Sequence, residues 1–176
     1  MAQFFTIGHS TRSTEEFIAI LQAAKVELLA DVRAIPRSRT NPQFNSDTLT
    51  EALASHGIEY LPMPELGGRR GKQRLTEVSP NGFWQNQSFK NYADYALTDA
   101  FRRGFARLRE SGASKRCAIM CSEAVWWRCH RRIITDYLIF SGEPVVHLLG
   151  LGKSEIAEPT PAAVPRHDGA VVYPAQ

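Results

Sequence analysis

The sequence lacks three features that would place it in a special structural class. No hydrophobic run approaches the roughly 20 residues that a membrane-spanning helix needs, so we expect no contact with a membrane. The first residues contain neither the basic segment nor the apolar core of a signal peptide, which indicates a cytoplasmic protein. The three cysteines, an odd number, do not suggest a disulfide framework and fit a reducing compartment.

The sequence also lacks a large excess of charge of one sign. The formal net charge is only +3, and 43% hydrophobic and 22% charged residues are ordinary values for a globular protein. A length of 176 residues suits one domain with a full core. However, basic side chains cluster within residues 33–39 and again within residues 69–74, with no acid in either segment. Each cluster alone is typical of a solvated loop, whereas the two together favour an anionic ligand.

Hydrophobic periodicity predicts alternating strands and helices. The predicted strands are residues 3–8, 28–32, 58–61, 117–120 and 144–149, and a helical pattern follows each of the first four. This alternation predicts an α/β fold, a single domain with a mostly parallel five-stranded sheet covered by helices on both faces. We expect the domain to span residues 1–152. Residues 153–176 are rich in proline and lack an apolar period, so we expect a surface or disordered tail.

The most informative stretch is residues 116–142, which is predicted to form a strand that runs directly into a helix at Cys121, Ser122 and Glu123. In an open α/β sheet such a junction binds ligands, because backbone N–H groups and the positive end of the helix dipole point into the crevice beyond the strand. Other polar segments also follow strand ends, so we expect them to share one edge of the sheet with this thiol and carboxylate.

These segments resemble the DUF488 family, which is defined by similarity and named for its unknown function. The resemblance covers roughly residues 4–150. It rests on Thr6-Ile7-Gly8-His9-Ser10, Asp31-Val32-Arg33, Pro36, Ser38, Asn41-Pro42-Gln43-Phe44-Asn45, Leu66-Gly67-Gly68, Met120-Cys121-Ser122-Glu123 and Cys129-His130-Arg131. The resemblance implies a fold and a candidate site, but the family brings no established reaction.

Four residues are candidates for catalysis. Cys121 at a helix N-terminus would be stabilised as a thiolate and would be labelled before Cys117 or Cys129, unless it is simply a small buried hydrophobe. Glu123 would act as a general acid or base, or would only cap the helix. His9 and Asp31 end two different strands, where they would either pair as base and orienting group or hold two loops together.

A larger set of residues is predicted to bind the ligand. These are Ser10, Arg33, Arg37, Ser38, Arg39, Asn41, Gln43, Gly67, Gly68, Arg69 and Ser122. Guanidinium and amide donors suit phosphate groups and base edges, although the same side chains can satisfy the backbone of their own loops.

No metal site or cofactor is expected. In a continuous helix, Cys129 would lie about 12 Å along the axis from Cys121, too far for both to bind one ion. His130 would lie on the helix face that packs on the sheet, so we interpret it as a core histidine with a backbone or carboxylate partner, and Arg131 as the member of an ion pair.

Two functional hypotheses follow. The first is a cysteine- or glutamate-dependent enzyme acting on a phosphate-bearing substrate, a nucleotide or nucleic acid, at the C-terminal ends of the strands. The alternative is a non-catalytic module that binds nucleic acid or a nucleotide there. A third hypothesis, a structural partner of another protein, would require an exposed apolar patch that the sequence does not locate. The sequence leaves the oligomeric state open.

Overall fold

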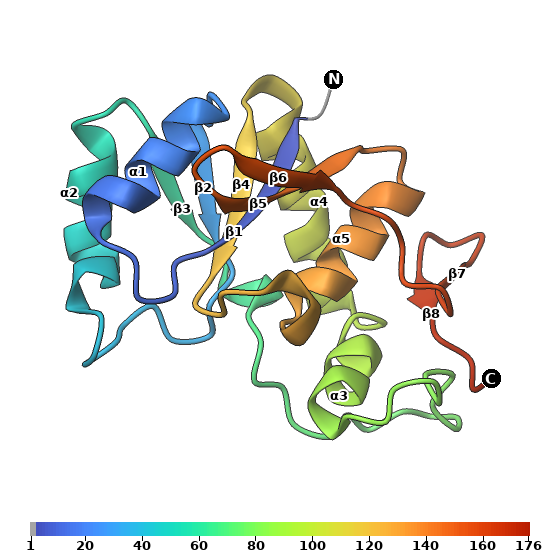
Figure 1. Ribbon diagram of the computed structural model, residues 1–176. Helices are drawn as coiled ribbons and strands as arrows, with labels where there is room; N and C mark the ends of the chain where they lie inside the picture. The colour runs from blue at the N-terminus through green and yellow to red at the C-terminus, as the bar shows by residue number, and fades with distance from the viewer. Residues whose placement is uncertain (1–2) are drawn as a thin grey trace.

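The structure, a computed structural model, describes residues 3–176 (Figure 1). The strands are β1 (Phe4–Gly8), β2 (Leu28–Asp31), β3 (Glu59–Pro62), β4 (Cys117–Cys121), β5 (Val145–Gly150), β6 (Lys153–Ile156), β7 (Val164–Pro165) and β8 (Val171–Val172). The α-helices are α1 (Thr14–Ala23), α2 (Ser46–Ala54), α3 (Gln87–Tyr95), α4 (Asp99–Ser114) and α5 (Arg131–Phe140). Short 3-10 helices are η1 (Pro42–Phe44), η2 (Pro64–Leu66) and η3 (Trp126–Arg128).

The main sheet has the strand order β3-β2-β4-β1-β5-β6. Its first five strands are parallel, and β6 pairs antiparallel with β5. The predicted α/β class with a mostly parallel sheet is confirmed. The sheet has six strands rather than five because the chain turns back after β5, at Gly152 with φ +72°, and adds residues that carry no apolar period.

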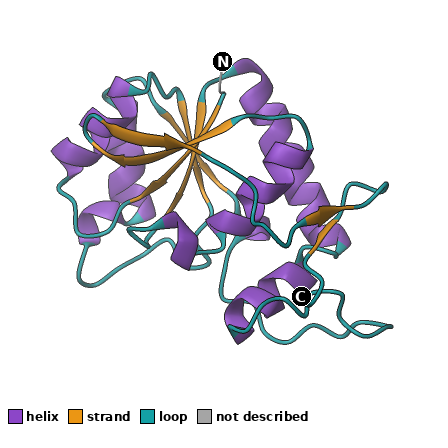
Figure 2. Cartoon of the chain, turned by 45° about the vertical axis from the view of Figure 1, so that its right-hand side comes forward, coloured by secondary structure: helices purple, strands orange, loops and turns teal. Residues whose placement is uncertain are grey.

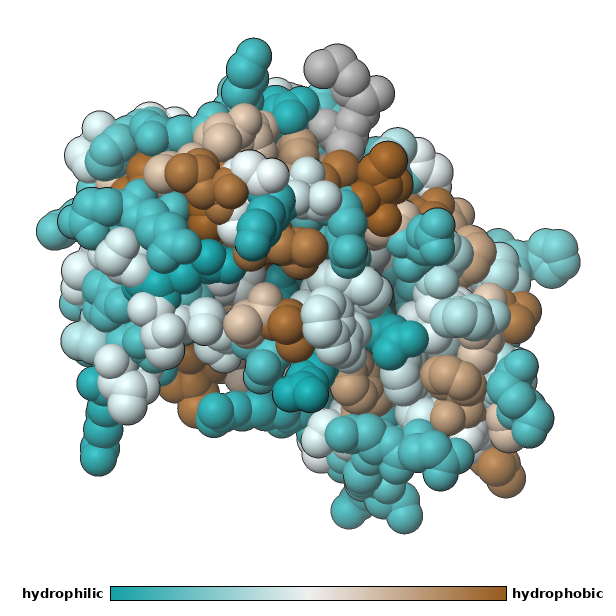
Figure 3. Space-filling view, in the orientation of Figure 1, coloured by the Kyte–Doolittle hydropathy of each residue, from teal (hydrophilic) through white to brown (hydrophobic). Residues whose placement is uncertain are grey.

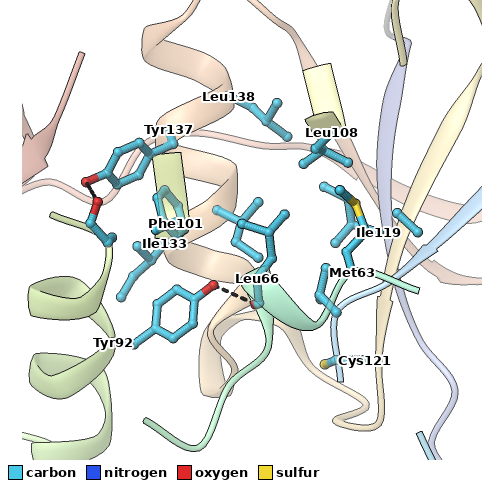
Figure 4. Packing of buried hydrophobic residues seen from close by; sticks show 14 of the residues in the cluster. Met63, Leu66, Tyr92, Phe101, Leu108, Ile119, Cys121, Ile133, Tyr137 and Leu138 are labelled. Atoms are coloured by element: carbon cyan, nitrogen blue, oxygen red, sulfur yellow. Dashed lines mark hydrogen bonds between the residues drawn. The ribbon is translucent and has the colours of Figure 1, made fainter. Parts of the chain in front are cut away.

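Helices cover both faces of the sheet (Figure 2). Alternate residues of a strand point to opposite faces, so β4 sends Ala118 and Met120 to one face and Cys117, Ile119 and Cys121 to the other. The first face packs on α1 and α2, and the second on α3, α4 and α5. Figure 4 shows Cys121 at one end of the second cluster, which is also where the strand ends.

The C-terminal segment differs from the expected tail. Its first residues form β6, and Tyr173 is fully buried in the core cluster that also contains Tyr137. The Tyr173 hydroxyl donates a hydrogen bond to Asp136 Oδ2 at 2.8 Å, and the Tyr173 N–H donates to Asn81 Oδ1 at 2.9 Å. Residues 153–159 and 164–169 lie mostly at the surface, whereas residues 170–173 are held in the core by single buried contacts that no periodic pattern could reveal.

The predicted helix start at Ser122 was wrong. Strand β4 ends at Cys121 as expected, but α5 begins only at Arg131, and Val125 and Cys129 have extended backbone angles. The intervening Trp126 stacks on His147 with ring centroids 4.3 Å apart and donates to Glu155 Oε1. These contacts with β5 and β6 hold the segment in a loop, and helical periodicity could not reveal them.

Within residues 3–176, no helix is long and apolar enough to cross a membrane. On the face seen in Figure 3, hydrophobic residues form small separate groups among hydrophilic ones. That face offers no broad apolar surface of the kind that the structural-partner hypothesis requires.

The packing of the C-terminal segment leads to a testable prediction. Tyr173→Phe leaves the buried Asp136 carboxylate without its hydroxyl donor, so we expect the free energy of unfolding to fall by about 1–3 kcal/mol. Chemical denaturation measures this loss. The control is Gln176→Ala, because Gln176 is exposed and its side chain bonds only to Pro174 of its own segment. Equal stability of Tyr173→Phe and the wild type would show that the hydrogen bond from Tyr173 to Asp136 does not stabilise the fold.

Candidate functional site

The site lies at the C-terminal ends of the central strands β1 and β4. The connection from β1 passes through α1 on one face of the sheet, whereas that from β4 passes through α5 on the other. Such a divergence leaves a crevice between neighbouring strands. A cavity of about 820 Å³ opens there. Its lining includes His9, Arg33, Cys121, Cys129 and His130.

Gly8 allows the two strand ends to approach closely. It lies opposite Cys121 in the parallel pairing, and a Cβ atom at Gly8 would fall 1.8 Å from the Glu123 carbonyl oxygen. The ladder continues beyond the strands, because the Ser10 N–H donates to the Ser122 carbonyl at 3.0 Å. Ser10 adopts φ +47°, which is uncommon for a residue with a side chain. Backbone strain of this kind is concentrated at functional sites.

Two cysteines meet in the cavity, contrary to the predicted geometry. The Sγ atoms of Cys121 and Cys129 are 2.7 Å apart, and both thiols are buried and free. The expected separation along a helix does not exist, because the chain from Ser122 to Arg128 loops back. It is Cys129, rather than Cys121, that lies next to the N-terminal end of a helix, namely α5.

The sulfur of Cys129 accepts hydrogen bonds from Arg131. Both the backbone N–H and the Nε–H of Arg131 donate to Cys129 Sγ at 3.3 Å. The Arg131 side chain is only 1% exposed, and a further guanidinium N–H donates to the Glu123 carbonyl at 2.7 Å. Within residues 3–176, no carboxylate forms an ion pair with Arg131. Because a buried cation needs a compensating charge, this arrangement favours the thiolate form of Cys129.

His130 completes the surroundings of this sulfur. Its Nε2 lies 2.7 Å from the Val32 carbonyl oxygen, which can only accept, so Nε2 carries a proton. The other nitrogen, Nδ1, lies 3.6 Å from Cys129 Sγ and is therefore placed to exchange the thiol proton. A Cβ atom at Gly68 would fall 2.8 Å from Nδ1, and Tyr92 packs on the ring at 5.0 Å, so the imidazole is fixed in position.

The pKa values of the two thiols in the cavity shift in opposite directions. Burial tends to raise the pKa of Cys129, but the hydrogen bond from Cys121 and the charges of His130 and Arg131 outweigh it and hold this pKa well below its ordinary value. Burial raises the pKa of Cys121 well above its ordinary value, and its hydrogen bond to Cys129 adds to the rise. We therefore assign the thiolate to Cys129, with the Cys121 thiol as its donor.

His9 and Asp31 do not pair directly. Asp31 is held by Arg33, which donates from Nε at 2.9 Å and from Nη2 at 2.7 Å, and by the Tyr60 hydroxyl at 2.5 Å. Arg33 also donates from Nη1 to His9 Nε2 at 3.4 Å, while His9 Nδ1 donates to the Ser10 carbonyl. Burial lowers the pKa of His9, and the Arg33 charge adds to this effect. Arg33 therefore separates the predicted pair and is itself engaged by Asp31.

The structure brings most, but not all, of the predicted ligand-binding residues together. Those that line the cavity are Ser10, Arg33, Arg37, Ser38, Asn41, Gly68, Arg69 and Ser122. Arg39 lines a neighbouring hollow instead. Gln43 donates to the Arg12 carbonyl at 2.9 Å, and Gly67 provides space for Ala34. These last two residues stabilise the loops that surround the cavity.

Sequence reasoning missed the roles of Cys129, His130 and Arg131. His130 does have the expected backbone partner, but it also contacts a sulfur, and Arg131 bonds to that sulfur instead of a carboxylate. The only sequence feature that pointed to these roles was the Cys-His-Arg triplet itself. In the predicted helix the three side chains would lie on different faces, so they were not expected to act together. Among the described residues, no group of three or more His, Cys, Asp or Glu side chains could hold a metal ion.

Comparison with known proteins identifies the family. A family model described as a domain of unknown function, DUF488, matches residues 13–138, which is more than half of the chain. The chain belongs to the DUF488 family. No curated protein and no solved structure matches it. The DUF488 match spans Asp31 to Arg131 and so includes both cysteines of the site, but it carries no reaction.

The contact between Arg131 and Cys129 predicts a specific pattern of stability. Cys129→Ala leaves the buried guanidinium without an anionic partner, so we expect a loss of roughly 3–5 kcal/mol in the free energy of unfolding. Arg131→Met in the same protein removes the unpaired charge and should recover much of that loss. Urea denaturation of the two single variants and the double variant measures the coupling. If the two losses simply add, the sulfur does not compensate the Arg131 charge.

Proposed function

We propose that this DUF488 protein is an enzyme that uses the Cys129 thiolate as a nucleophile on a phosphate-bearing substrate, a nucleotide or a nucleic acid. The observation that carries the proposal is the burial of Arg131 against Cys129 Sγ with no carboxylate partner within residues 3–176. A thiolate is far more nucleophilic than a thiol, so this environment supports catalysis rather than simple packing.

The cations at the entrance support an anionic substrate. Arg37, Arg69 and Arg128 are exposed, line the cavity, and form no ion pair within residues 3–176. Arg33 is engaged by Asp31, so it helps to position the site rather than to bind a free anion. Guanidinium groups bind phosphate oxygens through paired N–H donors. The half-buried ring of Phe89 lines the same cavity and offers a surface for a base.

In the proposed reaction each neighbour of Cys129 Sγ has a role. Cys129 Sγ forms a bond to the electrophilic atom of the substrate while the bond from that atom to its leaving group breaks. Arg131 stabilises the negative charge of the thiolate before the attack. His130 Nδ1 holds a proton after the thiol ionises and can donate it to the leaving group. The bond from His130 Nε2 to Val32 fixes the ring so that Nδ1 faces the sulfur.

Glu123 is a weaker candidate for the reacting group. Its side chain is exposed, and no hydrogen bond or ion pair within residues 3–176 fixes its carboxylate. Its backbone carbonyl, by contrast, accepts from Arg131 and lies against Gly8. Glu123 therefore contributes to the site through its main chain, and its carboxylate remains available for orienting a ligand.

The proposal predicts how the three cysteines react. Limited iodoacetamide at neutral pH should label Cys129 first, because its thiolate lines the cavity, whereas burial raises the pKa of Cys117 to about 12. A nucleoside monophosphate should slow the labelling of Cys129, and the matching nucleoside without phosphate should not. Mass spectrometry of digested protein measures both effects.

Matched variants separate binding from chemistry. Arg69→Ala should weaken the protection by phosphate, whereas Arg103→Ala, an exposed arginine on α4 outside the cavity lining, should leave it unchanged. Protection without consumption of any nucleotide or oligonucleotide offered would favour the non-catalytic module, which requires only the arginines. If Cys129 resists labelling until the protein unfolds, the nucleophile assignment is wrong.

A further inference from the structure

The second thiol of the cavity has a geometry that simple nucleophilic catalysis does not require. Cys121 Sγ and Cys129 Sγ are 2.7 Å apart, whereas an S–S bond is about 2.05 Å long, so little movement separates contact from a bond. Both cysteines line the same cavity. Cys117 lies further back in β4, is fully buried, and does not line the cavity.

We propose that Cys121 and Cys129 act as a dithiol that reduces small anionic disulfides, with Cys129 as the attacking cysteine and Cys121 as the resolving cysteine. This activity rests on the nucleophilic Cys129 proposed above, but it does not require a phosphate group on the substrate. Cys121 thereby acquires a catalytic role that is distinct from the one expected at a helix N-terminus.

The reaction proceeds in two exchanges. The Cys129 thiolate attacks one sulfur of a disulfide R–S–S–R′, which forms a bond from Cys129 to R–S and releases R′–S⁻. The Cys121 proton passes to the released thiolate, and the Cys121 sulfur attacks Cys129 Sγ. The bond from Cys129 to R–S breaks, R–S⁻ leaves, and a Cys121–Cys129 disulfide remains. The protein loses two electrons and the substrate disulfide gains them.

The surroundings suit both steps. Arg131 donates to Cys129 Sγ from its Nε–H, and its charge opposes the rise that burial causes in the pKa of Cys121. His130 Nδ1 faces Cys129, where it can donate a proton to a leaving thiolate. Among the described residues, the exposed Arg37, Arg69 and Arg128 have no ion-pair partner, and they favour a disulfide that carries negative charge.

Titration with dithiobis-nitrobenzoate, a chromogenic disulfide with two carboxylates, tests this activity. The reduced wild-type protein should rapidly release two equivalents of the coloured thiolate and retain none. Its mass should then be lower by two hydrogens, and peptide mapping should show a Cys121–Cys129 disulfide. Neutral dithiodipyridine is the control reagent, and Arg69→Ala should slow the reaction of the anionic reagent more than that of the neutral one.

Variants assign the two roles. Cys121→Ser should release one equivalent rapidly and keep the other half of the reagent on Cys129 as a mixed disulfide. Cys129→Asp keeps a negative charge beside Arg131 and should lose the rapid phase, and Cys117→Ser should behave as the wild type. A wild-type protein that releases one equivalent and retains the reagent would overturn the resolving role while leaving Cys129 reactive. Absence of any rapid release would overturn the reactive Cys129 as well.

Discussion

The burial of the Arg131 guanidinium against the sulfur of Cys129 is the interaction on which the site depends. An arginine that is 1% exposed cannot lose its charge, so the protein must supply negative charge or strong acceptors beside it. It supplies the Cys129 sulfur and the Glu123 carbonyl, and that carbonyl in turn lies against Gly8 of β1. One side chain thus joins the start of α5 to the ends of the two central strands.

Further contacts hold the loops around the site in position. The loop after β2 is held by the Asp31–Arg33 ion pair and by the Val32 carbonyl that accepts from His130. The loop after β3 brings Gly68 against the other edge of the imidazole. Segments that are distant in sequence therefore converge on the Cys129 sulfur through hydrogen bonds and close packing, which fixes the geometry before any ligand binds.

The sequence predicted those features that depend on periodicity. Alternating apolar strands and helices indicated the fold, and the polar residues after the strands indicated the edge of the sheet that carries the cavity. Sequence-based prediction failed where single tertiary contacts determine the conformation of the backbone. Trp126 packs on His147 and prevents a helix from starting at Ser122, and Tyr173 anchors a segment without any pattern. The contact between Cys121 and Cys129 depends on the loop that Trp126 holds, because a continuous helix would keep these two residues apart. It could therefore not be predicted from the sequence.

The central claim is that Cys129 is a thiolate at neutral pH, and ultraviolet absorbance of the thiolate against pH tests it most directly. The wild-type protein should retain thiolate absorbance well below the pH of about 8.5 at which a free cysteine ionises, and Cys129→Asp should lose that absorbance. Below the lowered pKa of Cys129 the absorbance should disappear as the sulfur is protonated. An absorbance that appears only above about pH 8.5 in the wild type would contradict the account.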